Sequence, residues 1–130
     1  MIYKVSKTKL DVIRFLNFVE NSLDIEVTKK GNLKLVLEEL LTNSINHTSN
    51  NIKPLEIEID VHNDSINIEY HEYSDLFNIY DYYNEKDIME DNINKMEEGG
   101  LGIFLIFNLI KNYQFIYDKK HLKNIMKFNI

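Results

Sequence analysis

Apolar residues recur every three or four positions in two long segments of the chain, which is the spacing of an amphipathic helix. The first segment predicts a helix that is capped by Ser6 or Thr8 and runs to about Ser22. The second predicts a helix from about Lys30 to His47, whose apolar side is the clearer of the two. That side is formed by Leu33, Val36, Leu37, Leu40, Leu41, Ser44 and Ile45.

A strict alternation of apolar and polar residues begins after Pro54. It covers Leu55 to Val61 and, after a short break, Ile66 to His71. The residues between them include Asn63 and Asp64, which are typical of turns. The two segments therefore predict a β-hairpin with one apolar and one polar face.

Shorter apolar segments complete the expected fold. Ile2 to Val5, Tyr113 to Tyr117 and Ile125 to Ile130 are predicted strands. Leu101 to Ile110 is almost wholly apolar, so its period alone does not separate a buried helix from a strand, and the glycines before it favour a helix. We expect one domain, residues 1–130, of the α+β class. It would be a two-layer α/β sandwich, with helices on one face of a mixed, mainly antiparallel sheet.

The segment from about residue 74 to residue 98 has no clean period. Tyrosines alternate there with acidic residues, among them Asp75, Tyr80, Asp81, Tyr82, Tyr83, Asp87 and Asp91. A segment this long without structure of its own is usually functional or mobile. It is either a functional loop, with tyrosines of the kind favoured at protein interfaces, or a solvated loop whose tyrosines partly pack on the domain.

Composition narrows the function classes. The chain has 130 residues, 44% of them hydrophobic and 28% charged, as in an ordinary globular domain. It contains no cysteine, which excludes disulfides and thiolate metal sites, and no run of about 18 apolar residues that could span a membrane. The net charge of −6 argues against nucleic-acid binding and favours a basic protein partner. We expect a cytoplasmic protein.

Three polar residues stand four positions apart on the second predicted helix. Glu39, Asn43 and His47 therefore line one side of it, at or just outside the edge of the apolar stripe. They are either a solvated polar face or one wall of a binding cleft. His47 is a weaker candidate, because a histidine at a helix C-terminus is also favoured by the helix dipole.

Glycine is concentrated directly before the last apolar run. Gly99, Gly100 and Gly102 are three of the four glycines in the chain. Glycine lets a backbone approach a phosphate closely, and a helix N-terminus offers N–H groups to an anion. A plain loop before a buried helix would look similar. Together with the polar helix side, the glycines predict a nucleotide site.

Both segments carry a family resemblance. EELLTNSINH at 38–47 resembles the N-box of the GHKL ATPases, which have the Bergerat fold, and EEGGLGIFLIFNLI at 97–110 resembles their second glycine box. The second box is similar to that of the small anti-sigma-factor serine kinases. The two boxes occur in the family's order, with a segment of lid length between them, and the resemblance covers most of the chain.

The resemblance implies a role for each matching residue. Asn43 would coordinate Mg²⁺ bound to the phosphates of ATP, and Glu39 would be the base that activates the attacking group. The backbone N–H groups of Gly100, Leu101 and Gly102 would contact the phosphates, and His47 and Glu72 would be further cofactor-binding residues. ATP and Mg²⁺ are thus the expected cofactors, and residues 74–98 would form the ATP lid.

The chain departs from the family at the first glycine box. There, a family aspartate binds the adenine amino group, and a glycine two residues later lets the base lie close. If Phe77 matches the aromatic residue at the start of the family's lid, Glu72 replaces the aspartate and Ser74 the glycine. Glu72 can still accept a hydrogen bond, but it is one methylene longer, and Ser74 adds a side chain.

The resemblance implies a switch kinase of bacterial partner switching. Such a kinase binds a sigma factor and phosphorylates a serine or threonine of a small antagonist protein. Relatives are often homodimers, for which Phe15, Phe18 and the helix from Leu101 offer interface residues. The altered first box keeps an alternative open, a degenerate, non-catalytic GHKL-fold module that sequesters a partner. A sensor histidine kinase fits less well, because the chain starts directly at the fold, without a phosphoacceptor hairpin.

Overall fold

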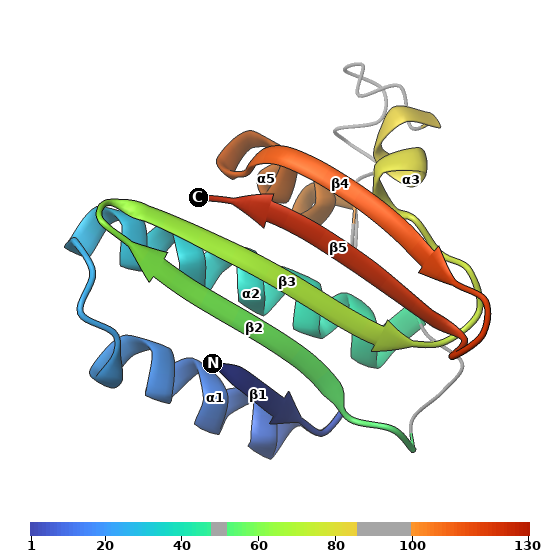
Figure 1. Ribbon diagram of the computed structural model, residues 1–130, viewed down its shortest axis with the longest axis horizontal. Helices are drawn as coiled ribbons and strands as arrows, with labels where there is room; N and C mark the ends of the chain where they lie inside the picture. Colours follow the sequence, from blue (N-terminus) through green and yellow to red (C-terminus); the bar gives the residue numbers. More distant parts are fainter. Residues whose placement is uncertain (48–51, 86–99) are drawn as a thin grey trace.

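Five strands form one sheet in the order β1-β2-β3-β5-β4 (Figure 1). The computed structural model describes residues 1–47, 52–85 and 100–130. The strands are β1 (Ile2–Val5), β2 (Leu55–His62), β3 (Ser65–Tyr73), β4 (Lys111–Asp118) and β5 (Lys123–Asn129). All four pairings between these strands are antiparallel. The expected, mainly antiparallel sheet is confirmed, and the described strands include no parallel pair.

The predicted hairpin of β2 and β3 lies at the centre of the sheet. Ile59 pairs with Ile68, and the turn residue Asn63 has a φ of 55°, a conformation that asparagine tolerates better than most residues. Buried residues alternate with more exposed ones along both strands. The alternation in the sequence therefore decides which face of the sheet meets the helices.

The helices α1 (Lys9–Ser22), α2 (Val27–His47) and α5 (Gly100–Leu109) lie behind the sheet in the view of Figure 1. Helix α2 is the central helix of this layer, because it contacts both α1 and α5. The expected two-layer sandwich, with helices on one face of the sheet, is therefore confirmed.

Polar side chains mark the starts of α1 and α2. Thr8, one of the two predicted caps, caps α1. Helix α2 begins at Val27, three residues earlier than predicted. The Glu26 carboxylate accepts the N–H groups of Thr28 and Lys29, both at 3.0 Å, and thereby satisfies donors that a helix start leaves unpaired.

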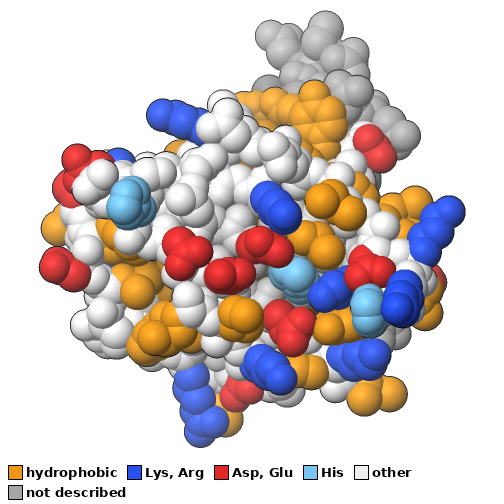
Figure 2. All heavy atoms as spheres, viewed as in Figure 1, with side chains coloured by type: hydrophobic (Ala, Val, Ile, Leu, Met, Phe, Trp, Pro, Cys, Tyr) orange, Lys and Arg blue, Asp and Glu red, His pale blue; other side chains and the backbone are white. Residues whose placement is uncertain are grey.

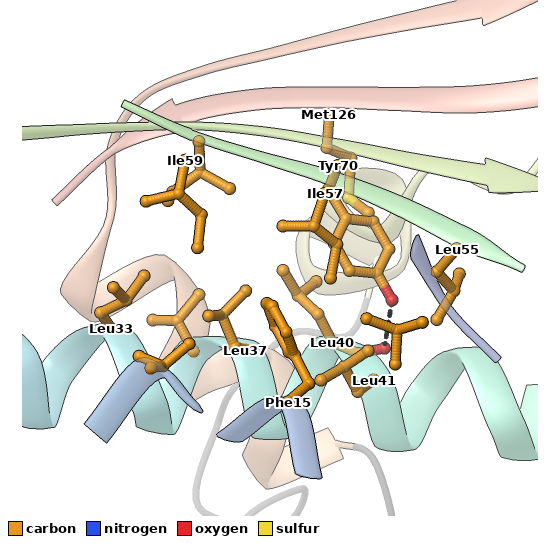
Figure 3. Close-up of a cluster of buried hydrophobic side chains, with 14 of the residues drawn as sticks. Phe15, Leu33, Leu37, Leu40, Leu41, Leu55, Ile57, Ile59, Tyr70 and Met126 are labelled. Atoms are coloured by element: carbon orange, nitrogen blue, oxygen red, sulfur yellow. Dashed lines mark hydrogen bonds between the residues drawn. The ribbon is translucent and has the colours of Figure 1, made fainter. Parts of the chain in front are cut away.

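The core lies between α2 and the sheet, as Figure 3 shows for one cluster of buried side chains. The predicted apolar stripe of α2 is confirmed, since all its members are buried except the half-buried Ile45. Its partners include Leu55, Ile57 and Tyr70 of the sheet. Fully burying an aliphatic side chain contributes about 1.5–3 kcal/mol, so this contact is the main apolar source of stability.

The phenylalanines of α1 belong to this core as well. Phe15 is only 7% exposed, and its ring centroid lies 5.7 Å from that of Tyr3. The ring centroid of Phe18 lies 5.0 Å from that of Tyr3. Burial within the monomer therefore accounts for Phe15 without a homodimer interface.

A short helix, α3 (Ile79–Glu85), follows β3 inside the segment for which no regular structure was predicted. The rings of Tyr80 and Tyr83 lie 5.4 Å and 4.8 Å from that of Phe107 on α5. Tyr80 also stacks on Tyr113 of β4, at 5.9 Å. These contacts, which join residues about 25–35 positions apart, stabilise a helix that the local sequence pattern does not reveal.

The other face of the sheet is polar, with acidic side chains gathered near its middle (Figure 2). Glu56, Glu58 and Asp60 alternate along β2 with the buried residues, and Glu69 of β3 stands opposite Glu58. None of the helices in the described part of the chain covers this face. None of them is long and apolar enough to cross a membrane.

Candidate functional site

Helix α2 carries Glu39 and Asn43 one turn apart. Asn43 is 7% exposed, and Glu39 is half-buried. A solvated polar face is therefore excluded for Asn43, because its side chain lies inside the protein. Buried polar side chains are costly unless they are paired or needed for a ligand, so this position calls for a functional explanation.

The Glu39 carboxylate lies directly against the first turn of α5. A Cβ atom added at Gly102 would stand 2.9 Å from Cδ of Glu39 and closer still to Oε2. Any side chain at Gly102 would therefore displace the carboxylate. This contact brings the predicted N-box and the predicted glycine box, 63 residues apart in sequence, to one place.

Burial also changes the acidity of Glu39. The loss of solvent raises the pKa of its carboxyl above the ordinary value of 4.5, and the neighbouring charge of Glu38 raises it further. A carboxylate with a raised pKa accepts a proton more readily, which suits a general base working near neutral pH.

Glu72, at the end of β3, is more deeply buried. Its side chain is 4% exposed, and Oε2 has no hydrogen-bond partner among the described residues. Burial raises the pKa of the carboxyl, while a hydrogen bond from Ser44, the charge of Lys7 and a hydrogen bond from Ser74 partly offset that increase. An acceptor without a partner in such a place can take a donor from a ligand.

Ser44, which makes a hydrogen bond to the Glu72 carboxyl, is itself paired with the buried hydroxyl of Tyr70. Tyr70 Oη lies 2.6 Å from Ser44 Oγ and donates to the Leu40 carbonyl at 3.3 Å. Figure 3 shows Tyr70 reaching from the sheet toward α2. Burial holds the pKa of Tyr70 well above 10, so the phenol stays neutral. It can therefore keep Ser44 oriented at all ordinary pH values.

Ser74, for which we predicted the place of the family glycine, is also held by a side chain. Ser74 is 6% exposed, and its Oγ accepts a hydrogen bond from Asn124 Nδ2 at 2.9 Å. Asn124, on β5, is 1% exposed. The serine is thus part of a buried polar network and does not point into solvent.

A small cavity lies between α2, β3 and the start of α3. It is lined by Leu40, Asn43, Ser44, Glu72, Phe77, Ile79 and Met126. Its volume is about 10 Å³, the size of about one water molecule. Asn43 Nδ2 and Glu72 Oε2 are both buried here without a partner among the described residues. Two unpaired polar atoms around one cavity need a partner, which a water molecule or a polar group of a ligand can supply.

Comparison with protein families agrees with this arrangement. The model of the histidine kinase-like ATPase domain matches residues 6–128, nearly the whole chain. The chain belongs to this family. Histidine kinase-like ATPase domains are members of the GHKL superfamily, and the sheet with helices on one face is their Bergerat fold. A comparison with curated proteins gave no match.

Histidine kinase-like ATPase domains bind ATP with Mg²⁺, and one half of the site suits this pair. Glu39, Asn43 and Gly102, which we call the phosphate end, combine an amide, a carboxylate and a glycine at a helix start. No group of three or more acidic or histidine residues in the described ranges could hold a metal alone. Mg²⁺ often takes most of its ligands from phosphates and water, so one protein ligand is sufficient.

The other half of the site is filled by side chains. We call Glu72, Ser74, Phe77 and Ile79 the base end. Ile79 is 3% exposed and lines the cavity together with Phe77, so the remaining 10 Å³ or so is far smaller than a purine. A base can contact Glu72 in this half only if Phe77 and Ile79 give way.

The structure thus gathers most of the predicted site residues. Glu39 and Gly102 are in contact, and Asn43 and Glu72 line one cavity. Gly100 is the first residue of α5, as expected for a phosphate-binding helix start. The side chains of Leu101 and His47 lie outside the described part, although His47 is the last residue of α2. Residues 86–99, including most of the expected lid and its two lysines, also lie outside it.

Several residues of the site were not predicted to belong to it. Ser44 was placed in the apolar stripe of α2. Its burial was therefore predicted correctly, but the hydrogen bonding of its hydroxyl was not. Ile79 lay in the segment without a period. Asn124 lay between two predicted strands, directly before Ile125. Its hydrogen-bond partners are about 50 positions away in sequence, so no local pattern could have found it.

Proposed function

We propose that this chain is an ATP-dependent switch kinase of the anti-sigma-factor type. It would transfer the γ-phosphoryl group of ATP to a serine or threonine of a small antagonist protein, and would bind a sigma factor in competition with it. Support comes from the family, from the resemblance of the second glycine box, and above all from the contact between Glu39 and Gly102.

That contact carries the proposal because it joins a base to a phosphate site. The N–H groups of Gly100, Leu101 and Gly102 at the start of α5 would hold the phosphates. Bound Mg²⁺, with Asn43 as its protein ligand, would neutralise charge on them. Glu39 would accept the proton of the attacking hydroxyl, whose oxygen bonds to the γ-phosphorus as the bond to ADP breaks. The Glu39 carboxylate lies beside that helix start, where the attack would occur.

The test compares two neighbouring glutamates. Glu39→Gln removes the proposed base but keeps its size, and Glu38→Gln is the matched control because Glu38 is exposed on the same helix. We expect Glu39→Gln to bind Mg²⁺-ATP within about threefold of the wild type while ATP turnover falls at least about 100-fold. Glu38→Gln should retain turnover. Equal turnover of wild type and Glu39→Gln, both shown to be folded, would contradict the role of Glu39.

The second candidate function is a non-catalytic module that sequesters a protein partner through the same fold. The filled base end favours it, because a cavity of about 10 Å³ next to Glu72 admits no purine unless side chains move. This candidate predicts no binding of ATP or ADP at millimolar concentration by the folded protein. Binding of its protein partner would then be independent of nucleotide.

The proposal includes a cytoplasmic homodimer. The net charge of −6 suits basic surfaces on the sigma factor or the antagonist. Since Phe15 is buried within the monomer, the dimer would use other residues. Sedimentation equilibrium of the purified protein tests the dimer, and a monomer at concentrations of about 100 μM would contradict it.

A further inference from the structure

Asn124 connects the last strand of the sheet to the segment that follows β3. Its Oδ1 accepts the N–H of Phe77 at 2.8 Å. Its Nδ2 donates to Ser74 Oγ and to the Asp75 carbonyl, both at 2.9 Å. One side chain, 1% exposed, thus makes hydrogen bonds to Ser74, Asp75 and Phe77, which are about 50 residues away in sequence.

Ser74 extends this network to Glu72. While its Oγ accepts from Asn124, its hydroxyl lies 3.4 Å from Glu72 Oε1 and 3.1 Å from the Asp75 carbonyl. Oε1 of Glu72 therefore faces Ser74, and Oε2 is the oxygen left without a partner beside the cavity. Ser44 also makes a hydrogen bond to the Glu72 carboxyl, and Ser74 is the residue that faces Oε1.

We propose that Asn124 and Ser74 are positioning residues for base recognition, which rests on the proposed nucleotide site. They hold the Glu72 carboxylate so that Oε2 can accept the amino group of an adenine, and they fix the backbone of residues 74–77 beside the base. Neither residue touches the base itself.

The chemistry of the replacement explains why two residues are needed. A glycine after the recognition carboxylate leaves room for a base without further help. A serine adds a polar side chain, which must be paired when it is buried, and which closes part of the space unless it is turned aside. Asn124 does both, because its amide offers two donors and one acceptor in one plane. Glu72, in turn, reaches further into the cavity than an aspartate would.

The experiment measures binding of Mg²⁺-ATP, Mg²⁺-GTP and Mg²⁺-tripolyphosphate by titration calorimetry. Asn124→Ala removes the three hydrogen bonds, and Asn129→Ala is the matched control, an asparagine of the same strand whose side-chain partners, Asn67 and Asn112, are remote from the cavity. We expect Asn124→Ala to lower the ATP-to-GTP affinity ratio at least fivefold, and tripolyphosphate affinity to change less than twofold. Asn129→Ala should leave all three affinities unchanged.

Two variants of Ser74, which leave Asn124 in place, test the proposal if Asn124→Ala does not fold. Ser74→Ala removes the hydroxyl that faces Glu72 and accepts from Asn124, but it leaves the Asn124 hydrogen bonds to Asp75 and Phe77 in place. It should lower the ATP-to-GTP ratio about threefold. Ser74→Thr keeps the hydroxyl and should retain at least half of the wild-type ratio. A general loss of folding would not produce this difference between alanine and threonine.

Each outcome bears on one proposal or on both. A wild type that prefers ATP, with a ratio unmoved by Asn124→Ala or Ser74→Ala, overturns the positioning role and leaves the nucleotide site intact. Equal losses for ATP, GTP and tripolyphosphate also overturn it. A folded wild type that binds tripolyphosphate but shows no preference for ATP overturns it as well. A wild type that binds none of the three overturns the proposed function together with it.

Discussion

The phosphate end and the base end of the candidate site are built in different ways. At the phosphate end, the absence of a side chain at Gly102 lets the Glu39 carboxylate lie on the start of α5. At the base end, side chains fill the space and hydrogen bonds hold them, leaving a cavity of about 10 Å³. Phosphate recognition needs little more than backbone N–H groups, so it tolerates sequence change around two glycines. Base recognition would depend on individual side chains, among them Glu72 and Ser74.

The largest expected effect comes from placing a methyl group at the phosphate end. Gly102→Ala would put its Cβ into the Glu39 carboxylate, which must rotate away. Rotation of a side chain costs little stability, but it removes the proposed base, so ATP turnover should fall about 100-fold. Gly31→Ala is the control, since a Cβ there meets nothing within 4 Å. It should leave turnover unchanged and stabilise α2 by up to about 1 kcal/mol. Retained turnover in Gly102→Ala would refute the assignment of Glu39.

Opening the base end is expected to have the next largest effect. Ile79→Ala should cost about 2–4 kcal/mol of unfolding free energy, as for other buried aliphatic truncations. The same change widens the cavity beside Glu72, so adenosine should bind at least threefold tighter. Ile66→Ala, also fully buried but on a distant part of β3, should cost similar stability without any gain in affinity. Denaturant unfolding and titration calorimetry measure both quantities, and weaker adenosine binding by Ile79→Ala would show that Ile79 does not obstruct the base.

The charge of Glu72 should appear in the pH dependence of stability. Burial raises its pKa above 4.5 in the folded protein, so the stability it contributes is complete below that value and is lost as pH rises through the folded pKa. Glu72→Gln removes this loss. Its unfolding free energy relative to wild type should therefore increase, by on the order of 1 kcal/mol, between pH 4 and pH 8.

Glu26 provides a control with the opposite sign. Hydrogen bonds from the backbone N–H groups of Thr28 and Lys29 lower the pKa of Glu26, so its contribution is present above the ordinary pKa and is lost on acidification. The unfolding free energy of Glu26→Gln should therefore fall furthest below that of the wild type at neutral pH. If Glu72→Gln behaved in the same way as Glu26→Gln, Glu72 would not be a buried, strained carboxylate.

The smallest expected effect is a shift of a pH profile. The charge of Glu38 helps to raise the pKa of Glu39, and a base works only when deprotonated. Glu38→Gln should therefore move the acidic limb of the turnover profile to lower pH, by a fraction of a pH unit, with little change on the plateau. Measuring turnover from pH 4.5 to 8 checks this. An unchanged or upward shift would argue against Glu39 as the titrating base.

Where a signal is local, the sequence predicts the structure well. A helix or strand that buries one face repeats apolar residues with the period of that element. The apolar stripe of α2 and the alternation in β2 and β3 follow from this, and both were predicted correctly. Glu39, Asn43 and the glycines were recognisable because helical spacing and a helix start are local features too. The start of α2 was missed because a glutamate, Glu26, supplies the cap.

The base end could not be predicted in the same way. The cavity depends on α3, which is stabilised by aromatic rings of α5 and β4. It also depends on Asn124, which is about 50 residues away from Ser74 in sequence. Glu72 and Ser74 were singled out from the sequence, but the hydrogen bond from Asn124 to Ser74 was not predicted. Tertiary contacts between distant segments decide such features, and a single sequence carries no local trace of them.

The central claim is that the phosphate end binds Mg²⁺-ATP through Asn43. Titration calorimetry with and without Mg²⁺ tests it most directly, on wild type, Asn43→Ala and the control Asn46→Ala, which changes an exposed asparagine of the same helix. We predict Mg²⁺-dependent binding by wild type and Asn46→Ala, and at least tenfold weaker binding by Asn43→Ala. Equal affinities in all three proteins, or no binding by a folded wild type at millimolar ATP, would contradict the claim.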